Sequence, residues 1–138
     1  MLLPVCDHYS GVEVRMRKSL QLQAEMTQEF GACVFDVTLD CEDGAPVGGE
    51  IEHAHLVKEI ANSAAPEARV AVRVHPVDHP SFFNDVNLIL KDAHRNLRHV
   101  MIPKVESVAD VDTAAQALNQ AGALTLPMHV LIESPAAV

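Results

Sequence analysis

Short apolar runs alternate with longer amphipathic segments along the chain. The runs are rich in β-branched and aliphatic residues, as buried strands are. In the longer segments apolar residues recur every three or four positions, which is typical of helices that pack on one face. The pattern predicts strands at 1–6, 34–39, 69–75, 99–103 and 128–133, and helices at 12–30, 50–62, 81–97 and 107–121.

Local signals mark the element boundaries. Residues 7–11 are polar, which predicts a loop between the first strand and the first helix. Glycine at positions 31 and 122 is expected to end a helix, because glycine readily adopts the left-handed conformation found there. Two serine–acid pairs have the spacing of a helix-capping box, Ser10 with Glu13 and Ser107 with Asp110.

The alternation of strand and helix predicts an α/β fold with a parallel sheet and right-handed crossovers. Polar residues at the carboxyl ends of successive strands lie 31, 31 and 29 residues apart, which is about one βα unit. Equal steps in sequence indicate equal steps around a sheet, as in a (β/α)8 TIM barrel, whose chemistry gathers at this rim. These residues are Glu42, Arg73, Lys104 and Glu133.

The chain is short for such a barrel. A complete one takes about 250 residues, whereas this chain has 138. We therefore expect residues 1–138 to be the amino-terminal portion of a single TIM-barrel domain, with about the first five strands and four helices. We also expect this portion to be inactive by itself.

The charge balance narrows the class of partner. The 19 acidic residues outnumber the 10 lysines and arginines, which gives a net charge of -9. Nucleic-acid binding requires a basic face, so we expect no nucleic-acid partner. The chain contains no run of 18 apolar residues, so no membrane span is predicted. The three cysteines, Cys6, Cys33 and Cys41, have no metal-site spacing, which indicates reduced thiols in a cytoplasmic protein.

The strand-end residues have the chemistry of an enolate-stabilising site. Glu133 is a charged residue at the end of an apolar strand. It is a candidate ligand for Mg²⁺, which typically binds one or two protein carboxylates together with water and substrate oxygens. Arg73 offers a planar fork for a substrate carboxylate. Glu42 and Asp43 are candidates to hold metal-bound water or to orient Arg73. A cation beside the developing oxyanion and a guanidinium on the acid are the parts that such chemistry needs.

Each of these residues alone also has a structural interpretation. A single strand-end glutamate or arginine is more often an ion-paired structural residue, and we favour that interpretation for Lys104 with Glu106. The acidic pair at 42–43 by itself fits a polar turn. Because all of these residues lie in register at one rim, we favour the functional interpretation: charged groups that gather in this way are typical of active sites. The eight histidines form no metal-binding pattern.

Four segments carry a resemblance to the HpcH/HpaI aldolase and citrate lyase β-subunit-like family. LDCEDGA at 39–45 resembles the family's LDLEDAV, and VRVH at 72–75 resembles VRVN. IPKVES at 102–107 is similar to LPKVES, and LIES at 131–134 to LIET. The segments follow the family's order and spacing over almost the whole chain.

The resemblance implies a Mg²⁺-dependent carbon–carbon lyase or aldolase, built as a TIM barrel that assembles as a homotrimer or homohexamer. It implies β-hydroxyacyl-CoA substrates such as malyl-, citramalyl- or citryl-CoA. Arg73 would bind the substrate carboxylate, and Glu133 would bind Mg²⁺ and touch the substrate. Glu42 and Asp43 would lie around the metal site as catalytic residues.

The chain also departs from the family pattern. The family's second metal carboxylate, an Asp on the strand after Glu133, is expected beyond Val138. The usual VPG followed by a basic residue reads VCDHY at 5–9, and His75 replaces the common Asn. The alternatives are a CoA-independent 2-oxo-acid aldolase of the same family and an inactive half-barrel that serves as an interaction fragment.

Overall fold

The computed structural model of the protein describes residues 6–138 and contains one parallel sheet of five strands in the order β1-β2-β3-β4-β5. The strands are β1 (Cys6–Ser10), β2 (Phe35–Asp40), β3 (Val70–Arg73), β4 (Val100–Ile102) and β5 (Met128–Val130). The helices are α1 (Glu13–Phe30), α2 (Glu50–Ser63), α3 (Phe82–Asp85), the π-helix η1 (Val86–Leu90), α4 (Lys91–Ala93), the 3₁₀-helix η2 (His94–Asn96) and α5 (Val108–Gln120).

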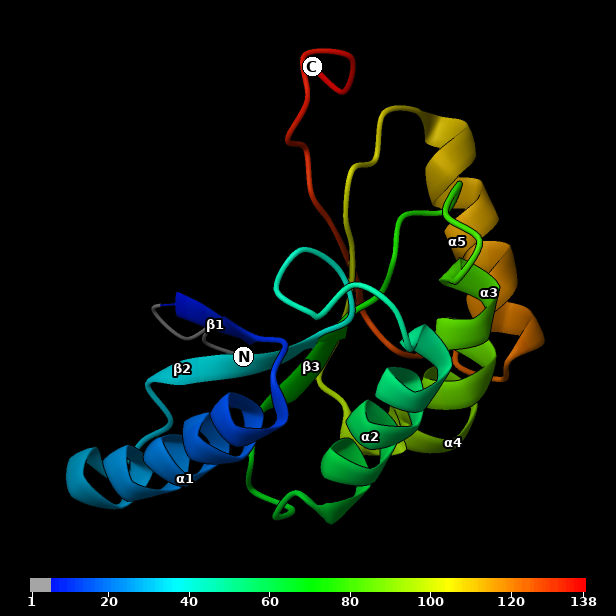
Figure 1. Ribbon diagram of the computed structural model, residues 1–138. Helices are drawn as coiled ribbons and strands as arrows, with labels where there is room; N and C mark the ends of the chain where they lie inside the picture. Colours follow the sequence, from blue (N-terminus) through cyan, green and yellow to red (C-terminus); the bar gives the residue numbers. More distant parts are fainter. Residues whose placement is uncertain (1–5) are drawn as a thin grey trace.

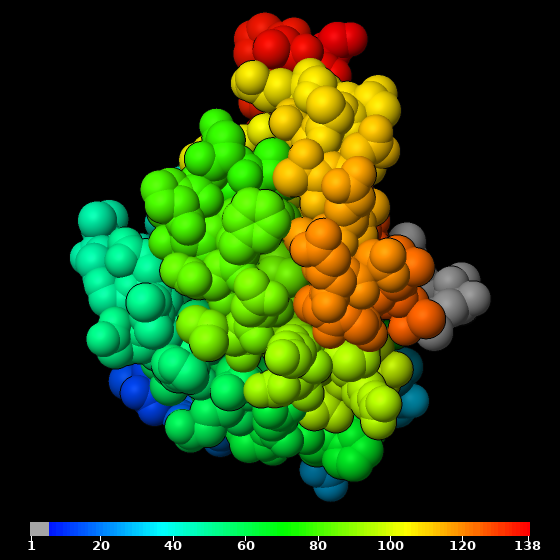
Figure 2. Space-filling view, turned by 90° about the vertical axis from the view of Figure 1, so that its right-hand side faces the viewer, coloured from blue at the N-terminus to red at the C-terminus, as the bar shows by residue number. Residues whose placement is uncertain are grey.

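The strands follow one another in sequence order, so the sheet has no point at which its direction of growth reverses. Right-handed crossovers then place successive helices on the same face, and Figure 1 shows the helices along one side of the sheet. Figure 2 shows the segment 82–96 between α2 and α5 on this helical face. This is the winding of a TIM barrel rather than of a doubly wound sheet, so the predicted fold class is confirmed.

The hydrophobic core lies between the sheet and these helices. Because side chains alternate across a strand, every second residue of the central strands faces the helices and is buried. The strand contribution to this core is Val37, Leu39, Val70, Val72, Val100 and Ile102. The main helical contribution is Met16, Ala54, Val57, Ile60, Phe82, Val86, Ile89, Leu90, Ala114 and Leu118.

The opposite face of the sheet, which is the inner face of the barrel, is polar. Asp36 on β2 pairs with Arg69 just before β3, with 2.5 Å between Oδ1 and Nε. Four residues further along both strands, Asp40 pairs with Arg73. The first pair therefore lies at the amino end of the sheet and the second at the carboxyl end.

Between these ends the inner face carries a second polar cluster. The Thr38 hydroxyl donates to Asp7 Oδ1 at 2.5 Å, and His99 Nε2 lies 3.5 Å from Asp7 Oδ2. The rings of His99 and His129 stack with centroids 4.0 Å apart. A polar inner face explains why β1 carries polar residues.

The prediction of the first strand is wrong in part. Residues 7–11 were expected to be a loop, but Cys6–Ser10 form β1, in parallel register with β2. The hydrophobic pattern missed this strand because Asp7 and Tyr9 face the polar inner side, and only Ser10 of the strand is fully buried. The apolar run predicted at 1–6 lies mostly outside the described residues.

Of the two predicted capping boxes, one is confirmed and one is wrong. Ser107 caps α5, where its hydroxyl accepts the Asp110 N–H and the Asp110 carboxylate accepts the Ser107 N–H. Helix α1 instead begins after Val12 without a side-chain cap. The Ser10 hydroxyl is buried and bonds the Ser19 hydroxyl at 2.9 Å, so it is occupied elsewhere.

The predicted helix at 81–97 is helical but not uniform. It runs from α3 through the π-helix η1 to α4 and the 3₁₀-helix η2, without an intervening strand or loop. A widened turn inside a helix is typical of functional positions.

The predicted end of the first helix at Gly31 is confirmed: this glycine has φ 71° and its N–H donates to Thr27 O.

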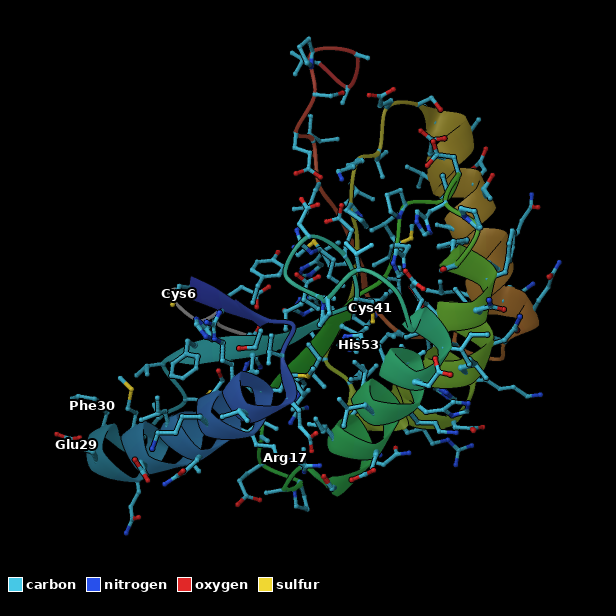
Figure 3. The ribbon with its side chains drawn as sticks, viewed as in Figure 1. Cys6, Arg17, Glu29, Phe30, Cys41 and His53 are labelled. Atoms are coloured by element: carbon cyan, nitrogen blue, oxygen red, sulfur yellow. The ribbon has the colours of Figure 1, made fainter. Side chains whose placement is uncertain are left out.

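The three cysteines are free, and no described helix is long and apolar enough to cross a bilayer. Cys6 is the first residue of β1 and is exposed, whereas Cys41 directly follows β2 and is buried (Figure 3). Burial raises the pKa of the Cys41 thiol well above its ordinary value, so this sulfur stays protonated.

Candidate active site

Charged side chains gather where the strands end. Asp40 and Arg73 are the last residues of β2 and β3, while Lys104 and Glu133 follow β4 and β5. Parallel strands bring their carboxyl ends to one edge of the sheet. The sequence therefore delivers these groups to a common rim, and the structure confirms that placement.

Arg73 is held by a two-point ion pair. Its Nε and Nη2 donate to the two carboxylate oxygens of Asp40 at 2.8 and 2.6 Å. The Asp40 side chain is fully buried and that of Arg73 is 12% exposed. Burial raises the pKa of Asp40, but the bonds from Arg73 and from two backbone N–H groups outweigh it and leave this pKa below its ordinary value. Both groups are therefore charged at neutral pH.

One face of the Arg73 guanidinium is covered by Tyr9. The guanidinium carbon lies 4.6 Å from the centre of the phenol ring, a cation–π contact. Burial and Asp7 raise the pKa of Tyr9, so its hydroxyl keeps its proton. Asp40 and Tyr9 together fix the plane of the guanidinium. The Nη1 edge, which Asp40 does not engage, faces Glu42 Oε2 at 3.4 Å.

The acidic turn after β2 is built around Asp40. Its two carboxylate oxygens accept the N–H groups of Glu42 at 3.0 Å and Gly44 at 2.7 Å. Gly44 in turn lies against Gly11: a Cβ added to Gly11 would come within 2.1 Å of the Gly44 oxygen. The loop after β1 and the acidic turn are thus packed backbone to backbone, which fixes the position of Glu42.

Lys104 links the acidic residues. Its ammonium bonds Glu42 Oε1 and lies 3.4 Å from Asp43 Oδ1, while its backbone N–H donates to Glu133 Oε1 at 2.8 Å. The bond to Glu42, ahead of the other contacts, raises the pKa of Lys104. Among the described residues Lys104 is the one non-glycine with positive φ, 54°. Such a conformation costs about 1–3 kcal/mol and is often found at functional sites.

The four strand-end residues singled out from the sequence are therefore connected through space. Arg73 contacts Glu42, Glu42 contacts Lys104, and Lys104 contacts Glu133. Lys104, which we favoured as structural, is the central link. Its predicted partner Glu106 is not at the site: the Glu106 side chain is exposed and its N–H donates to Asp110.

Sequence reasoning missed two members of this site. Asp40 lies on the same face of β2 as Asp36 and Thr38, and the register sets it beside Arg73, so the alternation of the strand could have identified it. Tyr9 could not be found in this way, because the segment 7–11 was predicted to be a loop.

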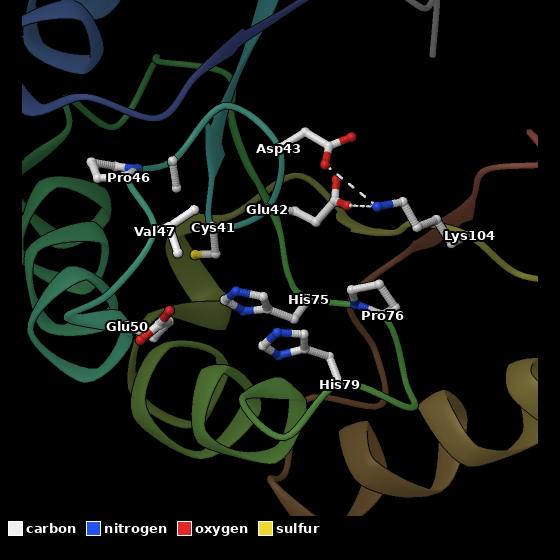
Figure 4. A pocket seen from close by; sticks show the side chains of 11 residues that line it. Cys41, Glu42, Asp43, Pro46, Val47, Glu50, His75, Pro76, His79 and Lys104 are labelled. Atoms are coloured by element: carbon white, nitrogen blue, oxygen red, sulfur yellow. Dashed lines mark hydrogen bonds and ion pairs between the residues drawn. The ribbon is translucent and has the colours of Figure 1, made fainter.

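A hollow of about 300 Å³ opens beside these charges (Figure 4). It lies between the acidic turn after β2 and the segment after β3. Glu42, Asp43 and Lys104 line one side, and His75 with His79 line the other. This volume admits a molecule of a few carbon atoms.

The residues present partly fit a metal ion. No group of three or more His, Cys, Asp or Glu within 6–138 is arranged to hold one. Mg²⁺, however, often takes only one or two protein carboxylates and keeps its waters. Glu42 Oε2 is buried and accepts no hydrogen bond among the described residues, although Arg73 Nη1 lies 3.4 Å away, so it can still accept from a metal-bound water. The exposed carboxylate of Glu133 is the other oxygen donor here.

Comparison with known proteins identifies the family of this chain. The family model described as HpcH/HpaI aldolase/citrate lyase matches residues 20–138. An L-malyl-CoA/beta-methylmalyl-CoA lyase of Cereibacter sphaeroides is 32% identical over 118 residues, which cover 80% of this chain and 37% of that protein.

Solved structures give the same result. A citrate lyase from Burkholderia xenovorans LB400 matches with a TM-score of 0.78 and 41% identity, over 99% of this chain and 43% of that one. A malate synthase from Haloferax volcanii, in a ternary complex with pyruvate and acetyl-CoA, matches with a TM-score of 0.72 and 19% identity, over 96% of this chain and 39% of that one. The latter likeness concerns the fold alone. The chain thus spans about two fifths of the length of these relatives.

Proposed function

Because the chain belongs to the HpcH/HpaI aldolase/citrate lyase family, we propose that the protein is a Mg²⁺-dependent carbon–carbon lyase that cleaves a β-hydroxyacyl-CoA through an enolate. Malyl-CoA is the substrate of first choice, since the matched Cereibacter sphaeroides protein is named for it. Residues 1–138 would form the amino-terminal portion of one TIM-barrel domain. The single observation that carries the proposal is the contact chain from Arg73 through Glu42 and Lys104 to Glu133.

Arg73 would bind the substrate carboxylate. Its Nε and one N–H of Nη2 are engaged by Asp40, which leaves the Nη1–Nη2 edge of the guanidinium as a second fork. Two parallel N–H···O bonds to a carboxylate fix both position and orientation. Glu42 faces part of this edge at 3.4 Å, so a bound substrate carboxylate would take the place of the Glu42 carboxylate there.

Glu133 would hold Mg²⁺ through its carboxylate and lie against the substrate. When bound, the ion would stabilise the negative charge of the enolate oxygen. Glu42 and Asp43 would hold the water molecules around it as catalytic residues. Lys104, bonded to both, would keep the two acids together and offset their mutual repulsion.

The test uses the protein at its natural length with L-malyl-CoA and Mg²⁺, and follows the release of acetyl-CoA and glyoxylate. We expect Arg73→Lys and Glu133→Gln each to lower kcat/KM by about 100-fold or more, as the loss of an electrostatic group at a reacting centre does. Arg17→Lys, which changes an exposed arginine on α1, is the matched control. Unchanged cleavage by the two site variants would sink the proposal.

The same preparation separates the alternatives. Free 2-oxo-acid aldols offered in parallel with thioesters would identify a CoA-independent aldolase. Absence of turnover with either class would favour an inactive interaction fragment.

We further propose that the protein is cytoplasmic and assembles as a homotrimer or homohexamer. Sedimentation would measure the mass of the assembly.

A further inference from the structure

His75 and Asp85 form a buried dyad outside the contact chain described above. The Nδ1 of His75 lies 2.6 Å from Asp85 Oδ2, and the backbone N–H of His75 donates to the same oxygen at 2.9 Å. His75 is 8% exposed and Asp85, the last residue of α3, is 1% exposed. Two bonds to one oxygen fix the imidazole relative to the carboxylate.

These contacts fix the tautomer of both histidines. An ionised carboxylate only accepts, so Nδ1 of His75 carries a proton and Nε2 of the neutral ring carries a lone pair. His79 has the opposite arrangement: its Nδ1 accepts the Ser81 N–H at 3.0 Å, so its neutral ring is protonated on Nε2. The two rings stack with centroids 4.3 Å apart and planes within 16° (Figure 4).

The His75 side of the dyad borders a hollow. His75 lines the same cavity as Glu42 and Lys104. Since its Nδ1 edge is turned to Asp85, its Nε2 edge is the one left for a molecule in the cavity. An imidazole whose second nitrogen is oriented by a buried carboxylate is the arrangement of a general base.

The surroundings of the His75 ring favour its protonated form. The bond to Asp85 raises the pKa of His75, burial lowers it, and Glu50 and Glu42 add to the rise, so that the pKa lies above its ordinary value. Asp85 Oδ1 is buried without a donor among the described residues, and an incompletely satisfied carboxylate favours a cation beside it. His79 and Lys104 are the basic groups on the same cavity and oppose that charge.

We propose that His75 is a catalytic acid–base residue that exchanges a proton with the β-hydroxyl group of a hydroxy acid bound in this cavity, and that Asp85 is its positioning residue. The proposal rests on the lyase function proposed above and adds the group that accepts the hydroxyl proton, a role not assigned there to any other residue. A neutral histidine suits this task because its Nε2 lone pair can accept the hydroxyl proton, and Asp85 stabilises the imidazolium that forms.

Cleavage begins at the hydroxyl group of the bound acid. Nε2 of His75 removes the hydroxyl proton, and the O–H electrons become the new C=O bond of the departing carbonyl product. The adjacent carbon–carbon bond breaks, and its electron pair passes into the thioester as an enolate. The imidazolium then returns the same proton to the enolate carbon, which releases the acyl-CoA product and restores the neutral ring.

The first test is independent of turnover. In ¹⁵N-labelled protein, the ring nitrogens of His75, identified by their loss in His75→Gln, are followed during titration with L-malate and with succinate, which lacks the hydroxyl. We expect L-malate, but not succinate, to shift the Nε2 resonance. We expect Asp85→Asn, but not the exposed Asp78→Asn, to abolish the tautomer preference. An Nε2 resonance that ignores L-malate, or responds equally to both acids, would overturn the proposal.

The second test is the pH profile of L-malyl-CoA cleavage. His75→Gln is expected to lower kcat by about 100-fold or more and to remove the acidic limb of the profile, and Asp85→Asn to move that limb to lower pH. The exposed His55→Gln is the control. A His75→Gln enzyme that keeps a tenth of kcat with an unchanged profile would refute the role. If the wild-type protein does not cleave L-malyl-CoA, the lyase function is refuted. The role of the His75–Asp85 dyad is then still tested by the resonance shift that depends on the hydroxyl group.

Discussion

Arg73 and Asp40 face each other at the carboxyl ends of neighbouring strands, joined by two N–H···O bonds of 2.8 and 2.6 Å. The same residue types meet four positions earlier on the same strands, where Arg69 pairs with Asp36. Only the pair at the carboxyl end contacts the acidic turn and, through Glu42, Lys104. A comparison of substitutions in the two pairs can therefore distinguish the contribution of such an ion pair to stability from its contribution to the site.

Asp40→Asn removes the charge that Arg73 needs while keeping the shape of the side chain. Because Arg73 then loses its two-point partner and keeps only the longer contact with Glu42, we expect the free energy of unfolding to fall by about 3 kcal/mol, measured by urea denaturation. Asp36→Asn is expected to have a comparable effect on stability. Only Asp40→Asn should weaken the response of Arg73 to a carboxylate ligand. Equal effects of both variants on ligand binding would contradict the assigned role.

The Asp40 pair also predicts how stability depends on pH. The pKa of Asp40 is lower in the folded protein than the ordinary value of 3.8, so the folded state favours the ionised form. Its contribution is fully present above about pH 4 and is lost as the pH falls through the lower folded pKa. Urea midpoints between pH 7 and pH 2.5 should therefore fall less steeply in Asp40→Asn than in the wild type. An equally steep fall would assign the acid sensitivity to other carboxyls.

Lys104 offers a test of backbone conformation separate from charge. A left-handed residue other than glycine costs about 1–2 kcal/mol, and Lys104 has φ 54°. Lys104→Gly and Lys104→Ala lose the same ammonium group, but only glycine accepts this conformation without strain. We expect the glycine variant to be more stable than the alanine variant by about 1 kcal/mol in thermal or urea unfolding. A more stable alanine variant would contradict the positive φ.

The strand–helix alternation was sufficient to predict the sheet order and the rim, because buried parallel strands and amphipathic helices have different periods. The capping box at Ser107 was predictable because it depends on two nearby residues. The first strand was not, because its side chains satisfy a polar inner face that only the assembled sheet creates. For the same reason Tyr9 was missing from the predicted site.

Within the site, spacing predicted which residues share the rim but not what each one contacts. Arg73 was expected to present its full fork, yet Asp40 takes half of it. Lys104 was expected to pair with Glu106 and instead bonds Glu42. Such choices depend on rotamers and on which backbone donors lie within reach, and neither is encoded in residue spacing. The His75–Asp85 contact, which joins a strand end to a helix, belongs to the same class.

Gly11→Ala tests whether the backbone contact between the two loops positions the acidic turn. The added methyl carbon would lie 2.1 Å from the Gly44 oxygen, so one loop has to move. Overpacking of this kind costs about 1–3 kcal/mol, and because Gly44 N–H bonds Asp40, the shift should reach Glu42. We expect lower stability together with changed amide resonances at residues 42–44. Gly122→Ala is the control. This glycine has φ 74° and no neighbour within 4 Å of an added carbon, so the variant should lower stability without altering those resonances. The same amide changes in both variants would show that the loop contact does not position the turn.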